Sequence, residues 1–105
     1  MTAGGDRFAE LAEPLLATAG VTRSTMMGLP CLRREGAFFA AWDRGTGALL
    51  VKLAPTRVDE LLATGAAEPF APAGRRFRQW AAVPSKRERS WPGLLHEALK
   101  FAAGR

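Results

Sequence analysis

Residues 36–53, GAFFAAWDRGTGALLVKL, contain two short apolar runs separated by a glycine-containing turn. Alternate positions in each run share one parity: Phe38, Ala40 and Trp42 before the turn, and Leu49, Val51 and Leu53 after it. The turn, residues 44–47, supplies two glycines, which adopt positive φ at no steric cost. The stretch therefore predicts a β-hairpin that is buried on one face and partly covered on the other.

The segment before this hairpin, residues 28–36 (GLPCLRREG), predicts another strand that ends in a turn at Glu35 and Gly36. Pro30 cannot donate to a strand ladder, which favours an edge position or the first residues of the strand. The connections are too short for crossovers, so we expect a three-stranded antiparallel meander from Cys31 to Leu53.

The chain before the meander predicts a helix followed by a connector. Residues 6–19 carry apolar side chains at helical spacing, with Asp6 as the expected N-cap. Pro14 interrupts the pattern, so a kink or break is expected near residues 11–13. Residues 21–27 show no clean period and are interpreted as a connector.

Two further helices are predicted after the meander. The first covers residues 55–63, with Pro55 in its first turn and Gly65 at its C-terminal end. The second follows Ser90 as N-cap and has the clearest apolar stripe in the chain. The stripe consists of Trp91, Leu94, Leu95, Ala98, Leu99 and Ala102.

Between these helices, the sequence predicts irregular chain and one more strand. Residues 68–74 contain too many Pro and Gly breaks for regular structure, residues 76–83 alternate as a strand, and residues 85–89 form a charged connector. The predicted fold class is α+β, with a mostly antiparallel sheet in α-β(3)-α-β(1–2)-α order and helices packed on one face.

Composition indicates a single domain spanning residues 1–105. No apolar run approaches the ~20 residues of a membrane span, and no secretory signal is recognised at the N-terminus. Cys31 is the only cysteine, which excludes an internal disulfide and a cysteine-rich zinc site. We therefore expect a cytoplasmic protein with no membrane partner.

Several stretches resemble the TfoX N-terminal domain family, to which the YjbR-like proteins are related. These are GLPCLRREGAFFAAW (residues 28–42), LLVKLAPTRVDELLATGAAEPFAPAGRRFRQWAAVP (residues 49–84) and the final helix that begins with Trp. The resemblance covers roughly residues 24–103. It implies an α+β domain with an antiparallel sheet. The full-length members resemble regulators of DNA-uptake genes and carry a second domain, and the resemblance of the first domain alone does not transfer that role to this chain. It implies no catalytic or cofactor residues.

Cys31 and His96 are the one nucleophile–base pair to consider, but they come from different predicted elements and no local nucleophile motif accompanies them. The plainer interpretation is a buried small hydrophobe and a solvent-facing helix residue. One His and one Cys are too few for a metal site. The sequence thus predicts a non-enzymatic domain with no catalytic, cofactor-binding or metal-binding residues.

Positive charge gathers in the C-terminal third. Residues 1–68 contain seven basic and eight acidic side chains, whereas residues 69–105 contain eight basic and two acidic. Six of these basic residues bracket the predicted strand at 76–83: Arg75, Arg76, Arg78, Lys86, Arg87 and Arg89. They are the candidate site for nucleic acid or an acidic protein partner, and a solubilising surface is the plain alternative.

A second hypothesis is a protein-interaction domain, or a homodimer, that uses an exposed sheet face. The hairpin places large apolar groups on both parities, more than one layer of helices would cover: Phe38, Phe39, Trp42, Leu49 and Leu50.

Overall fold

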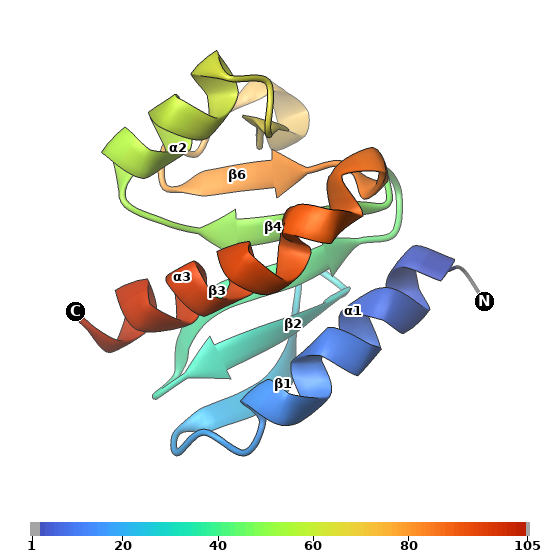
Figure 1. The fold of residues 1–105 in the computed structure, drawn as a ribbon, viewed down its shortest axis with the longest axis vertical. Coiled ribbons are helices and arrows are strands. Elements are labelled where there is room, and N and C mark those ends of the chain that lie inside the picture. Colours follow the sequence, from blue (N-terminus) through green and yellow to red (C-terminus); the bar gives the residue numbers. More distant parts are fainter. Residues whose placement is uncertain (1–2, 105) are drawn as a thin grey trace.

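The computed structural model describes residues 3–104, and this part of the chain forms three α-helices and one six-stranded antiparallel sheet (Figure 1). The helices are α1 (Ala3–Leu15), α2 (Pro55–Ala63) and α3 (Trp91–Ala103). The strands are β1 (Val21–Met26), β2 (Leu29–Arg34), β3 (Ala37–Asp43), β4 (Ala48–Lys52), β5 (Glu68–Pro69) and β6 (Trp80–Val83). Two 3₁₀ segments, η1 (Pro72–Gly74) and η2 (Ser85–Ser90), flank β6. The strand order is β1-β2-β3-β4-β6-β5. The α+β class predicted from the sequence is confirmed.

The meander has four strands rather than three, because the segment interpreted as a connector forms β1, which pairs with β2. β1 lies at the sheet edge and only Val21 is buried in it, so no apolar period marks the strand in the sequence. The β1–β2 turn places Met27 and Gly28 at φ 53° and 78°, and the β2–β3 turn places Glu35 and Gly36 at φ 51° and 83°. In each turn, two consecutive residues thus adopt the left-handed conformation, and the twist of such a turn matches that of the strands that it joins.

The β3–β4 hairpin is confirmed, but one of its predicted faces is wrong. The pairing between β2 and β3 changes register between Leu32 and Arg33, so that Phe39 is an extra residue in β3. This β-bulge puts Phe39 and Ala40 into the same core and leaves Phe38 on the opposite face. Leu49, Val51 and Leu53 do share the core face, as their parity predicted.

The hairpin turn also differs in detail from the prediction. Of its two glycines, only Gly47 has positive φ, at 78°. Gly45 instead donates its backbone N–H to the Asp43 side chain, 2.9 Å away. The aspartate therefore supplies part of the turn geometry that the sequence assigned to a glycine.

The first helix starts earlier and ends earlier than predicted. Asp6 lies inside the first turn of α1, where its charge favours the helix N-terminus, rather than at the N-cap. Pro14 is the penultimate residue of α1, so the helix runs through residues 11–13 without the predicted break and ends at Leu15.

The other two helices are close to their predicted bounds. α2 begins at Pro55 and is followed by Gly65 at φ 77°. The predicted α3 stripe is buried at Trp91, Leu94, Leu95, Ala98 and Leu99. Ser90, however, is not a side-chain cap: its hydroxyl donates to the Arg87 carbonyl oxygen at 2.8 Å, because the chain arrives through η2 in a helical conformation.

The segment from residue 64 to residue 83 departs most from expectation. The predicted irregular stretch contains β5 and η1, and the predicted strand at 76–83 is reduced to β6. The backbone N–H of Phe77 donates to the Phe70 carbonyl oxygen at 3.0 Å, and that of Trp80 donates to the Phe77 carbonyl oxygen at 3.1 Å. The chain therefore loops back on itself before β6 begins.

Buried side chains form two clusters on the two sides of the sheet. The larger cluster unites α1, α2 and α3 with strand residues such as Leu32, Val51 and Val83. In Figure 1, α1 crosses in front of β1 and β2, while α3 crosses in front of β3 and β4. The smaller cluster consists of Cys31, Ala41 and Leu50, with half-buried side chains from the strands and from Phe70 around them. The face bearing this smaller cluster is called the open face below.

Candidate functional site

The six basic residues singled out in the sequence fall into two groups at opposite ends of β6. Arg75, Arg76 and Arg78 precede it, and Lys86, Arg87 and Arg89 lie in η2 after it. The strand between the two groups has four residues and is about 13 Å long. The structure thus distributes these side chains over two places.

Within the group that precedes β6, Arg75 and Arg76 contact different parts of the protein. Arg76 forms an ion pair with Asp59 of α2 at 3.2 Å, whereas Arg75 lies over the Phe77 ring with its guanidinium carbon 5.5 Å from the ring centre. Arg75 therefore belongs with an aromatic group, and Arg76 mainly anchors the loop to α2.

Four apolar residues in register form the floor of the open face. Cys31, Ala41, Leu50 and Ala82 are successive partners across β2, β3, β4 and β6. The first three are at most 2% exposed. Half-buried side chains, among them Phe38, Phe70 and Trp80, pack around this floor, so the centre of the face is apolar.

Next to this floor, cations and aromatic rings alternate across four strands. The Arg33 guanidinium carbon of β2 lies 4.9 Å from the centre of the Phe38 ring of β3. Lys52 of β4 is the direct partner of Trp80 of β6. The side chain of Lys52 shares the parity of Leu50 and therefore points to the open face.

The loop before β6 extends this line. The Phe70 ring centre lies 6.4 Å from that of Trp80 and 5.8 Å from that of Phe77, over which Arg75 is placed. We call the whole set the cation–aromatic row: Arg33, Phe38, Lys52, Trp80, Phe70, Phe77 and Arg75. Phe77 is 37% exposed, and Phe38, Phe70 and Trp80 are half-buried. The rings are thus held by their neighbours yet remain accessible in part.

Of this row, only Arg75 was among the predicted basic site residues, and Phe38 was among the apolar groups expected on the sheet face. Arg33, Lys52, Trp80, Phe70 and Phe77 were not among the predicted site residues. Lys52 was visible as the charged position in a buried run, and Arg33 as a cation in a strand. Their relation to Phe38 depends on the bulge, which has no signature in the sequence.

The candidate catalytic pair is not brought together. Cys31 belongs to the cluster on the open face, while His96 lies on the exposed side of α3, whose other side packs on the opposite face of the sheet. Burial raises the pKa of the Cys31 thiol, against the opposing effects of nearby Arg33 and of hydrogen bonds with Ser24. Such a thiol is a poor nucleophile near neutral pH. Within residues 3–104, no three His, Cys, Asp or Glu side chains gather as a metal site would require.

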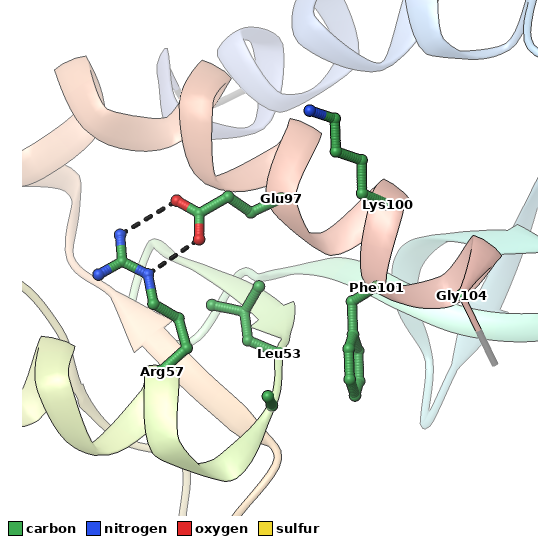
Figure 2. Close-up of a pocket in the computed structure, with 7 residues that line it drawn as sticks. Leu53, Arg57, Glu97, Lys100, Phe101 and Gly104 are labelled. Atoms are coloured by element: carbon green, nitrogen blue, oxygen red, sulfur yellow. Dashed lines mark hydrogen bonds and ion pairs between the residues drawn. The ribbon is translucent and has the colours of Figure 1, made fainter.

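A separate cavity of about 630 Å³ lies between the start of α2 and the end of α3. In Figure 2, Leu53 and Phe101 border it, Arg57 and Glu97 face each other beside it, and Lys100 points away. Arg57 donates to Glu97 through Nε at 2.8 Å and through a terminal nitrogen at 3.1 Å. Arg57 and Glu97 neutralise each other and Lys100 points away, so this cavity offers a ligand mainly an apolar wall.

None of the helices within residues 3–104 combines the length and the hydropathy needed to cross a membrane. Comparison of the chain with protein-family models, curated proteins and solved structures finds no match.

Proposed function

We propose that this chain is a small, cytoplasmic, non-enzymatic binding domain that takes a single-stranded nucleic acid on its open face. The observation that carries the proposal is the cation–aromatic row. The resemblance to the TfoX N-terminal domain and the excess of basic residues in the C-terminal third agree with an acidic partner of this kind.

The row combines the two groups that single strands require. Bases stack on aromatic side chains and on guanidinium planes, and the neighbouring phosphates are attracted by cations. Arg33 and Arg75 each lie over a ring, and Lys52 stands beside Trp80 in the adjoining strand. A base can therefore stack at several successive points while its phosphate remains near a positive charge.

A single strand suits this surface better than a duplex. Reading a duplex requires a helix or ribbon that protrudes into a groove. The row instead lies along a sheet face, where unpaired bases can be laid flat. We therefore expect the protein to prefer unpaired strands and to show little sequence preference.

The test is a fluorescence-anisotropy titration with a labelled 12-nucleotide strand and its duplex. We expect tighter binding of the single strand, and weakening as salt rises. The double variant Phe77→Ala/Arg75→Ala loses one stacking ring and the cation above it, so it should bind the single strand about tenfold or more weakly. The matched control is Arg23→Ala, because Arg23 pairs with Glu13 of α1 on the helix side of the sheet.

Two outcomes of this titration would contradict the proposal. One is the absence of binding at low salt. The other is an equal effect of Arg23→Ala and of the Arg75 and Phe77 substitutions, which would indicate general attraction to a positive protein rather than a site.

A second candidate function is self-association through the other part of the open face. Met26 and Leu29 are half-buried there, and Met27 in the adjoining turn is 69% exposed. Exposed apolar groups of this size commonly mark protein interfaces. Light scattering between micromolar and millimolar concentration tests it: a homodimer that Met27→Asn weakens supports this candidate, and a monomer throughout excludes it.

A further inference from the structure

A pocket of about 310 Å³ lies between α1 and η2, and three cations line it. Arg7 comes from α1 and Lys86 and Arg89 come from η2, which also contributes Ser85 and Glu88 to the lining. The sequence marked Lys86 and Arg89 as basic but gave no reason to place Arg7, which is far from them along the chain, beside them.

The charges in this pocket are only partly balanced. Arg7 Nε lies 3.4 Å from a carboxylate oxygen of Glu88, and a terminal nitrogen of Arg7 lies 3.8 Å from Glu10. Among residues 3–104, no carboxylate forms an ion pair with Lys86 or Arg89. The pocket thus combines two uncompensated cations with a third that already holds an oxyanion.

We propose that this pocket binds a phosphate group, which takes the place of Glu88 beside Arg7. The forked guanidinium groups of Arg7 and Arg89 suit tetrahedral oxyanions, and Lys86 adds a point charge. Ser85 contributes a hydroxyl donor. A phosphate dianion carries twice the charge of the carboxylate that it displaces, so it interacts more strongly with the three cations.

This site is separate from the cation–aromatic row. Arg7 lies on α1, which packs on the sheet face opposite the row, so a strand stacked on the row does not pass through the pocket. The inference therefore does not rest on the proposed function, and each can fail without the other.

The test uses inorganic phosphate as the probe on the full chain labelled with ¹⁵N. Phosphate is titrated against sodium chloride of equal ionic strength, and the amide shifts of Arg7 and of η2 are followed. We expect saturable shifts with phosphate only. Lys86→Ala/Arg89→Ala should weaken binding about tenfold or more, because two of the three cations are lost. Lys100→Ala, which removes a cation from α3 outside the pocket, is the control.

Glu88→Gln makes the prediction sharper. It removes the competing carboxylate and one negative charge, so we expect phosphate to bind several-fold more tightly, opposite in sign to the effect of removing the cations. Shifts that are equal in chloride, or affinities unchanged by Lys86→Ala/Arg89→Ala, overturn the proposal. If the Glu88→Gln variant binds phosphate more weakly, the inference that phosphate displaces Glu88 from Arg7 is wrong.

A final titration identifies the source of the phosphate. The same amides are followed with a 5′-phosphorylated oligonucleotide and with its 5′-hydroxyl counterpart. Larger shifts with the phosphorylated strand assign the pocket to strand ends. Equal shifts, with inorganic phosphate binding intact, assign it to a free phosphate or a small phosphate ester.

Discussion

The indole N–H of Trp91 donates a hydrogen bond to the backbone carbonyl oxygen of Val83, 3.2 Å away in the core. Trp91 begins α3 and Val83 ends β6, and both side chains are fully buried. This contact fixes the angle at which the chain leaves the sheet, passes through η2 and returns across it as α3. The last helix is therefore tied to the sheet at its first residue as well as along its apolar stripe.

We predict that Trp91→Ala lowers the free energy of unfolding by about 3–5 kcal/mol, because it opens a large cavity in the core. A domain of this size has only about 5–15 kcal/mol in total, so the variant should be poorly folded. Lys100→Ala, exposed on the same helix, should change stability by less than about 0.5 kcal/mol. Denaturant melts compare the two. Small effects of equal size would mean that α3 contributes little to the core.

The Arg57–Glu97 pair, which joins α2 to α3, should contribute little to stability despite its two hydrogen bonds. Both side chains are about 40% exposed, with values of 39% and 41%. We expect a coupling of about 0.2–1 kcal/mol from a double-mutant cycle of Arg57→Ala and Glu97→Ala, decreasing as salt rises. Coupling well above this range, unaffected by salt, would show that the pair is more shielded from solvent than its exposure indicates.

Cys31 should make stability depend on pH in the alkaline range. Because burial raises the pKa of its thiol, the folded state holds this proton at pH values where the unfolded chain has lost it. The contribution of Cys31 is thus fully present below the ordinary thiol pKa and is lost as pH rises through the higher pKa of the folded state. Urea melts from pH 7 to pH 10 should show this decline, and Cys31→Ala should reduce it. The same decline in both proteins would assign it to other groups.

Met27→Asn should stabilise the β1–β2 hairpin. Met27 has φ 53°, a region that asparagine tolerates better than methionine, and its side chain is 69% exposed. We expect a gain of about 0.5 kcal/mol in the free energy of unfolding, measured by denaturant melts at low protein concentration. A loss of stability would show that the methionine side chain supports the turn through its own contacts.

Local patterns in the sequence determined the elements whose period is complete within one segment. The α3 stripe from Trp91 to Leu99 and the start of α2 at Pro55 needed no information from the rest of the chain. The same holds for the parity of Leu49, Val51 and Leu53. In each case one face of a single element packs on the core. The spacing of apolar residues within that element therefore predicts which side chains are buried.

Only the tertiary structure decided the features that depend on pairing between segments. β1 is a strand because β2 offers it a partner, although its own residues show no period. Phe38 reaches Arg33 because a bulge in β3 shifts the register. Arg7 of α1 pairs with Glu88 of η2 because the two segments lie side by side. The physical reason is the same throughout: register and docking are set by contacts between segments distant in the sequence, and no single segment carries that information.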